Sequence, residues 1–418
     1  MQARPRRSTH SSQTTLVLPC PPPGIKCRRG VSEFPERLPF HILTNIFFMA
    51  RDGNDTSEFD HGGELVHWDS MESARAWTTV CRAWHDAAVF ALYHSVAIIG
   101  SVDAYHFLLA LQAHPERAAY VKFLVVGLHC DDEANPGTAR ARFESDQVLH
   151  VLEALPNIAH LHIRPLHPSA RRRLLAALRK KPLRSLACLP RLESSFNALF
   201  RSADLIDMIS PELERLDMDF WADPTEVTPA TITFPPLALV EVRLFCSNAD
   251  SPILALLAAA GPRLESIYVY FECLFDKKSA ASAALLPSAD TLRSLTWVVN
   301  PVLHELEARF NPRALQVFDQ ILPRFTRLVH LRTSATEVST NLFRILPPAL
   351  RRIELNAFHH SPSFHFDANI LSAINDQTID FRSLAEFELH DEGWSRRDVK
   401  AVGRALRARG VAFIFKPI

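Results

Sequence analysis

An apolar triplet recurs along the chain from about residue 118, and it limits the possible folds more than any other feature of the sequence. Each copy contains an apolar residue, two other residues, an apolar residue, one other residue and a third apolar residue. The second and third apolar positions alternate with period 2, which predicts a short strand with one buried face. The ten copies are Val121/Leu124/Val126, Ile158/Leu161/Ile163, Leu183/Leu186/Cys188, Leu213/Leu216/Met218, Leu239/Val242/Leu244, Leu264/Ile267/Val269, Leu292/Leu295/Trp297, Leu328/Leu331/Thr333, Leu350/Ile353/Leu355 and Leu384/Phe387/Leu389.

The middle residues of successive copies are 22 to 37 residues apart, and helical stretches are predicted between several of them. These stretches cover residues 169–180, 197–209, 253–260 and 312–322. Strand followed by helix at about 20–30 residues per repeat is the spacing of a leucine-rich repeat. We therefore expect an α/β fold over residues 101–418, an irregular solenoid with parallel inner strands and outer helices. An ordinary α/β domain with strands of this pattern is the alternative.

Glycine is scarce and proline abundant, at 12 and 29 of the 418 residues. The sequence contains no G-x-G, no G-x-x-x-x-G-K-[ST] and no G-x-S-x-G. It therefore lacks the motifs of dinucleotide-binding folds, P-loops and hydrolase nucleophile elbows. Six of the ten triplets have a proline within the three preceding residues, which we expect to end the outer helix and lead the chain into the strand.

The charge balance argues against a generic nucleic-acid-binding surface. The chain has 46 Lys and Arg against 46 Asp and Glu, so its formal net charge is 0. The longest apolar run, 253–260, is far shorter than the ~20 residues of a membrane span, so no membrane association is expected. Seven scattered cysteines without a C-x-x-C motif favour reduced thiols in an intracellular protein, in the cytoplasm or the nucleus. Cys188 is predicted to be buried on a strand.

Residues 1–33 are basic and rich in proline. They hold six Lys or Arg residues, no acid before Glu33, and three successive prolines at 21–23. This composition predicts a disordered tail. An organelle presequence or a nuclear address is the alternative interpretation.

Residues 34–100 show a helical pattern in two halves. Leu38, Ile42, Leu43, Ile46 and Phe47 form an apolar stripe that predicts a helix over 38–50, with Pro39 at its first position. Residues 51–69 are polar and predict a loop. A second helix is expected from about residue 69 to residue 93, followed by a short strand over 96–99.

This segment resembles an F-box, on the residues Leu38-Pro39-x-x-Ile42-Leu43-x-x-Ile46-Phe47, then Val80-Cys81-Arg82-x-Trp84-x-x-Ala87, then Leu92-Tyr93 and Val96. Phe40-His41 and the long 51–69 loop depart from the family pattern. Fungal members commonly continue into irregular leucine-rich repeats. The resemblance implies a substrate-recognition subunit of a Skp–cullin–F-box type ubiquitin ligase. Its partners would be a Skp-type adaptor, a cullin reached through that adaptor, and a protein substrate.

The residues that we expect to bind the adaptor are large and apolar, and a small helical unit cannot bury all of them internally. They are Leu38, Pro39, Ile42, Leu43, Phe47 and Trp84. Packing of this segment against the repeat domain is the alternative, above all for Ile46, Val80 and Cys81.

A substrate would bind on the inner surface of the repeats, which the residues beside the last two apolar positions of each triplet should form. Tyrosine and other aromatic residues dominate binding energy at many interfaces. The residues expected to bind substrate are Arg215, Arg243, Phe245, Tyr268 and Tyr270. Alternatively, Tyr268 and Tyr270 cover a neighbouring repeat.

Other chemistry has weak support in the sequence. His359, His360 and His365 lie in a Ser/Pro loop with only Asp367 to complete a metal site, so no metal is expected. The Asp217/Asp219 pair lacks an accompanying nucleophile. Arg171–Arg173 with Lys180 and Lys181 predicts a solvated helix face. We therefore expect no enzymatic activity and no cofactor, and a protein-binding scaffold without a ubiquitin role is the second functional interpretation.

Overall fold

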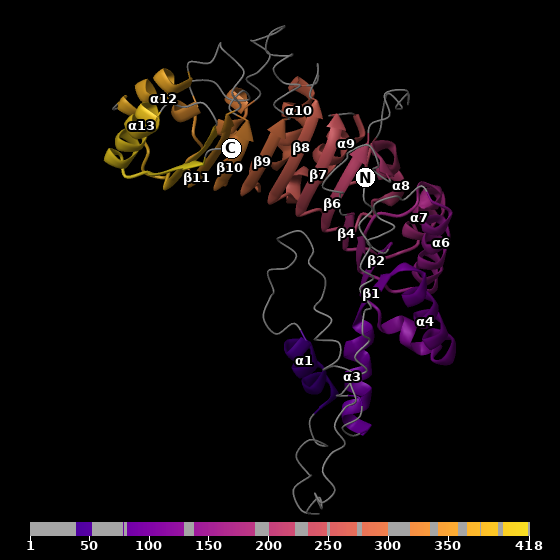
Figure 1. The fold of residues 1–418 in the computed structure, drawn as a ribbon. Helices are drawn as coiled ribbons and strands as arrows, with labels where there is room; N and C mark the ends of the chain where they lie inside the picture. Colours follow the sequence, from indigo (N-terminus) through magenta and orange to yellow (C-terminus); the bar gives the residue numbers. More distant parts are fainter. Residues whose placement is uncertain are drawn as a thin grey trace, which may run out of the picture.

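The chain forms one long, curved sheet with helices along its outer side, as seen in a computed structural model (Figure 1). The structure describes residues 39–51, 78, 82–128, 138–188, 200–221, 233–248, 251–273, 278–299, 318–334, 342–357, 366–376, 378–391 and 396–416. Every strand pairing in these residues is parallel. The prediction of an α/β fold with parallel strands is confirmed.

The sheet has 13 strands, and neighbours in the chain are neighbours in the sheet apart from β5 (Phe200–Arg201), which pairs with the end of β6. The others, in spatial order, are β1 (Ser95–Ile99), β2 (Phe123–Gly127), β3 (His160–Ile163), β4 (Ser185–Cys188), β6 (Arg215–Trp221), β7 (Glu241–Asn248), β8 (Ser266–Cys273), β9 (Ser294–Val299), β10 (His330–Ser334), β11 (Arg352–Ala357), β12 (Glu386–Asp391) and β13 (Ala412–Lys416).

All ten apolar triplets place their last two residues on a strand, and their middle residues align in register. Leu124 pairs with Leu161, and the same row continues strand by strand to Ile353 and Phe387. These positions are buried in one continuous hydrophobic core between the sheet and the helices. A regular apolar row of this kind fixes the register, because a slip by one residue would expose it.

The helices lie along the outer side of the sheet or before its first strand (Figure 1). The outer helices are α4 (Gly100–Ala113), α6 (Ala139–Ala154), α7 (Arg171–Leu178), α8 (Leu205–Met208), α9 (Ser251–Ala260), α10 (Lys278–Leu285), α12 (Phe366–Asn375) and α13 (Arg396–Ala408). Two more, α1 (Phe40–Arg51) and α3 (Arg82–His94), precede the sheet and share a small core of their own.

Two of the four helices predicted between triplets are wrong where the structure describes them. Residues 200–209 contain β5, a 3₁₀ turn and the short α8, because the Asp204 carboxylate accepts the Arg201 backbone N–H at 2.9 Å and starts a new turn there. Residues 318–324 form two 3₁₀ turns instead of a helix. The stretches at 169–180 and 253–260 are helical over most of their predicted length.

Proline follows the prediction at some triplets and differs from it at others. Pro156 lies two residues after the end of α6, as expected, whereas Pro262, Pro287 and Pro323 each lie at the beginning of a 3₁₀ turn. The missing N–H is harmless at such a position. The chain becomes extended only afterwards, for example at Leu264.

The basic cluster at α7 is only in part the solvated face that the sequence predicted: Arg172 and Lys180 are exposed, whereas its other cations have partners within the fold. Arg171 makes two 2.7 Å hydrogen bonds to the buried Asp204, and Arg173 makes two 2.6 Å hydrogen bonds to Glu153. Lys181 is buried and donates to the Leu155 carbonyl. These cations join neighbouring outer elements to one another.

Candidate binding face

Every second residue of the strands points away from the helices, and together these residues form what we call the inner face. In one row, Asp217 pairs with Arg243, Arg243 with Tyr268 and Tyr268 with Thr296. Parallel neighbours lie about 4.8 Å apart, so their side chains form a continuous surface.

The predicted substrate-binding aromatic residues meet at the middle of the inner face. The Phe245 ring centroid lies 5.4 Å from that of Tyr268 and 6.3 Å from that of Tyr270. All three side chains are half-buried, so part of each ring faces solvent. We call Phe245, Tyr268 and Tyr270 the aromatic trio.

The two predicted arginines lie beside the trio and share a carboxylate. Glu241 is 3.2 Å from Arg243 Nε and 3.8 Å from Arg215 Nε. Glu241 was not among the residues predicted to bind substrate. Apolar and other residues alternate on β7, which places Glu241 on the same face as Arg243. This pattern could have identified Glu241 as the partner of both arginines.

Asp217 has an unusual environment next to this group. Burial raises the pKa of its carboxyl to about 6, although the Arg243 charge acts in the opposite direction. Burial also raises the pKa of the Cys188 thiol to about 12, with further contributions from Asp219 and Asp217. A thiol with that pKa stays protonated at neutral pH and is a poor nucleophile. The prediction that Cys188 is buried is confirmed.

A second cluster, which we call the C-terminal charge network, covers β10 to β13. Its members are His330, Arg332, Arg352, Glu354, Glu386, Glu388, His390 and Lys416. No residue of this network was among the predicted site residues. The strand register brings these residues together in rows, such as Arg332, Glu354 and Glu388 on three successive strands.

Glu354 is the centre of the network. Its carboxylate lies 2.6 Å from Arg352 Nη2, 3.1 Å from His330 Nε2 and 3.6 Å from Arg332 Nε. The hydrogen bond from His330 and the neighbouring cations hold the pKa of Glu354 at about 2, in spite of its burial. The carboxylate is therefore ionised at any physiological pH.

Glu388 is the second buried carboxylate of the network. It lies 2.5 Å from His390 Nε2, 2.6 Å from Lys416 Nζ and 2.9 Å from Arg352 Nη2. Burial raises the pKa of Glu388, but the hydrogen bonds from Lys416 and His390 outweigh this effect and keep the pKa below its ordinary value. Arg352 thus bridges the two buried carboxylates.

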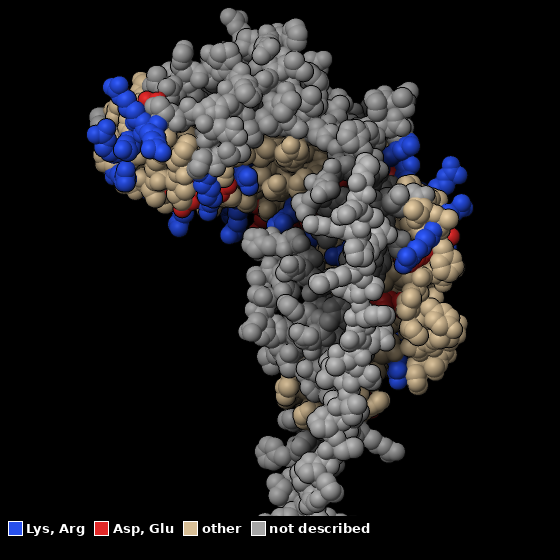
Figure 2. Space-filling model, in the orientation of Figure 1, with Lys and Arg blue, Asp and Glu red and all other residues tan. Residues whose placement is uncertain are grey.

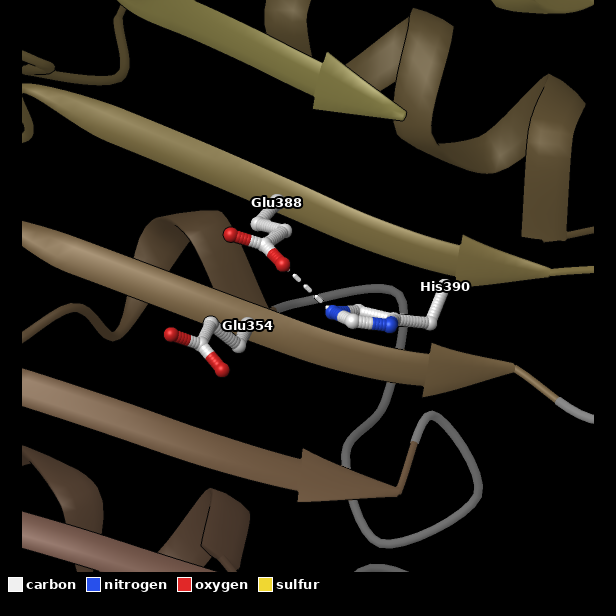
Figure 3. A group of neighbouring side chains, drawn as sticks. All are labelled: Glu354, Glu388 and His390. Atoms are coloured by element: carbon white, nitrogen blue, oxygen red, sulfur yellow. Dashed lines mark hydrogen bonds and ion pairs between the residues drawn. The ribbon is translucent and has the colours of Figure 1, made fainter. Parts of the chain in front are cut away.

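Glu354, Glu388 and His390 are also the one group in the described residues whose geometry suits a metal ion (Figure 3). Their potential ligand atoms lie within 4.8 Å of one another. Two carboxylates and an imidazole match the preferences of zinc and other transition metals. However, Arg352 and Lys416 already neutralise both carboxylates, so a metal ion would have to displace two cations. The His359, His360 and His365 group lies outside the described residues.

The predicted adaptor-binding residues divide into an exposed and a buried set. Pro39, directly before α1, and Ile42 on α1 are exposed. Leu43 and Phe47 are buried against α3, where the Trp84 ring lies 5.4 Å from that of Phe47 and is half-buried. Leu38 lies outside the described residues.

Two further apolar residues of α1, Phe40 and Ile46, were not assigned to the adaptor and are both exposed, although Ile46 was a residue for which we weighed an inward position. Ile46 forms one apolar stripe with Pro39 and Ile42, which we call the α1 stripe. Phe40 lies on the α3 side of the helix, where its ring centroid is 5.8 Å from that of Phe90. Positions 39, 42 and 46 follow the i, i+3, i+7 spacing of one helix face.

In comparisons with known proteins, no family model matches this chain, and no curated protein matches it either. Among the described residues, no helix has both the length and the apolar composition that a membrane crossing requires.

Proposed function

We propose that this chain is a non-enzymatic receptor of the F-box kind, which docks on a Skp-type adaptor through the α1 stripe and holds a protein substrate on the inner face. The observation that carries the proposal is the presence of two separate surfaces suited to protein binding in one chain. One is the apolar α1 stripe, and the other is the aromatic trio with its bordering charges.

The α1 stripe supports the adaptor-docking half of the proposal. Ile42 and Ile46 are 38% and 40% exposed on a helix that already buries Leu43 and Phe47 on its other side. Burying two such side chains in a partner's groove would contribute about 1–2 kcal/mol each, since part of their surface is already covered. An α-helix that shows apolar residues at this spacing is suited to a helix-in-groove interface.

The inner face supports the substrate-binding half. A cluster of aromatic residues surrounded by charged groups is the typical composition of a protein-binding hot spot with its polar rim. Holding a substrate beside an adaptor-bound enzyme raises its effective concentration and requires no catalytic residue in the receptor.

The test is co-purification of the full chain with a Skp-type adaptor. Ile42→Asp/Ile46→Asp should abolish the complex. Val102→Asp/Leu109→Asp on α4 is the matched control, because these two residues are also exposed apolar side chains of a helix. Absence of the complex with the intact chain, or equal loss in both double variants, would refute adaptor docking.

A protein-binding scaffold without a ubiquitin role is the second candidate. It is favoured by the burial of Leu43 and Phe47, since these motif residues have a structural role in the α1–α3 core that needs no adaptor. In that case the chain would bind a partner protein through the inner face alone. The double variants on α1 and on α4 would both leave that binding unchanged.

A further inference from the structure

Most ion pairs of the inner face are asymmetric, with the cation more exposed than the carboxylate, although Arg243 and Glu241 are nearly balanced at 30% and 26% exposed. In the C-terminal charge network, the Lys416 side chain is 55% exposed and that of its partner Glu388 is 1% exposed. Arg352, which also pairs with Glu388, is 43% exposed. Arg332 is 36% exposed, whereas its partner Glu354 is 9% exposed. The surface that a partner meets is therefore more positive than the residue count suggests.

Ion pairs at the edge where the strands begin provide an internal comparison. Arg184 and Glu214 are 63% and 50% exposed, and Arg293 and Glu265 are 62% and 54% exposed. Both charges are nearly equally accessible there. An arginine side chain is longer than a glutamate side chain and is therefore somewhat more exposed in any ion pair. The difference in exposure between cation and carboxylate in these pairs of the C-terminal charge network is much larger than that.

The exposed cations lie on both sides of the aromatic trio. Arg215 is on β6 and is the most exposed member of its ion pair with Glu241. Arg332, Arg352 and Lys416 follow on β10, β11 and β13. Between them, the accessible residues of β8 and β9 carry no charge among those whose exposure the structure describes: Ser266, Tyr268, Tyr270 and Ser294. Figure 2 shows blue Lys and Arg groups along the lower border of the C-terminal arm, with smaller red areas between them.

We infer that the inner face binds an acidic protein segment: an aromatic or large apolar residue on the trio, with Asp or Glu residues on the bordering cations. This inference rests on the proposed substrate-binding role of the inner face and specifies the chemistry of the substrate. A basic segment would meet the exposed cations and could reach the recessed carboxylates only by displacing Arg352 or Lys416.

The strand spacing gives the pattern that the segment should show. From Tyr268, Arg332 is two strands away and Lys416 is five strands away. At about 4.8 Å per strand these distances are about 10 and 24 Å. An extended peptide covers about 3.3 Å per residue, so acids are expected three to seven positions from the aromatic anchor.

The experiment is selection of a random 16-residue peptide library on the full chain, with parallel selection on Tyr268→Ala/Tyr270→Ala. We expect peptides enriched only on the wild type to carry an aromatic residue with Asp or Glu three to seven positions away. Enriched peptides that are basic or show no charge preference would overturn the inference and leave the inner face as a binding site. Identical peptides on both proteins, or none on either, would overturn the proposed role of the inner face itself.

Charge-neutralising variants then test the positions. For a selected peptide, Arg332→Gln or Lys416→Gln should weaken binding by about two- to fivefold, the effect of one partly exposed ion pair. Arg382→Gln, at a fully accessible position outside the inner face, is the matched control and should change nothing. Equal binding of a peptide that keeps its acids but has alanine in place of the aromatic residue would show attraction of any polyanion and overturn the inference.

Discussion

Glu354→Gln is the substitution that tests the C-terminal charge network most directly. It keeps the shape of the side chain and removes the charge that His330, Arg332 and Arg352 surround. The folded protein then retains three cationic or polar partners around a neutral amide. We expect Glu354→Gln to have a lower free energy of unfolding than the wild type at neutral pH, and this difference should disappear at acidic pH.

The pKa of Glu354 gives the magnitude. It is about 2 in the folded chain, against an ordinary value of 4.5, and each pKa unit corresponds to about 1.4 kcal/mol. The ionised carboxylate thus stabilises the fold by at most about 3 kcal/mol, and by about 2 kcal/mol once solvent screening of the exposed cations is included. Because the folded pKa is lowered, this contribution is complete above pH ~4.5 and is lost as the pH falls toward 2.

The assay is urea unfolding of wild type and Glu354→Gln at pH 7 and pH 3. At pH 7 the variant should be less stable by about 2 kcal/mol, and by pH 3 more than half of this difference should be gone. Glu265→Gln is the matched control: its ion pair with Arg293 is exposed, so its effect should stay within about 0.5 kcal/mol. A Glu354→Gln effect as small as that of the control, or one independent of pH, would refute the reasoning.

Three further predictions follow from other parts of the fold. Burial raises the pKa of Asp217 to about 6, so its ionisation destabilises the fold as the pH rises through that value. In urea unfolding, Asp217→Asn should therefore be more stable than the wild type by about 2 kcal/mol at pH 7.5 and equally stable at pH 4. A Cβ on Gly261 would lie 2.3 Å from Pro287 Cβ, so Gly261→Ala should lower stability by about 1–3 kcal/mol in thermal unfolding. Arg352→Met/Lys416→Met should bind Zn²⁺ in calorimetry, because Glu388 loses Arg352 and Lys416 and Glu354 loses its nearest cation, whereas the wild type should not.

The sequence predicted the sheet well because each strand depends on a local pattern. Two buried residues separated by one other are enough to specify a strand with one buried face, and all ten such patterns became strands in register. The outer connections were harder to predict. In residues 200–209, for example, the Asp204 carboxylate accepts the Arg201 backbone N–H and also binds Arg171 from another element, and no local pattern indicates these contacts.

The candidate site was predictable only in its apolar part. Phe245, Tyr268 and Tyr270 could be placed together from the alternation on two neighbouring strands. The C-terminal charge network could not, because the pairs that link its strands join residues 22 to 36 positions apart, such as His330–Glu354 and Arg352–Glu388. Nor does a sequence indicate which member of an ion pair is buried, and that property decides the sign of the charge that a partner meets.

The junction between α3 and β1 connects the two proposed binding surfaces. Helix α3 ends at His94 and β1 begins at Ser95, with no residue between them. The His94 ring lies 5.2 Å from the Phe123 ring, which stacks on His160 at 4.1 Å, so side chains of β2 and β3 fix the end of α3. A flexible linker would dilute a bound substrate with respect to the adaptor, roughly as the −3/2 power of linker length. A direct junction packed by aromatic rings avoids this dilution, which is the property that a receptor acting by proximity requires.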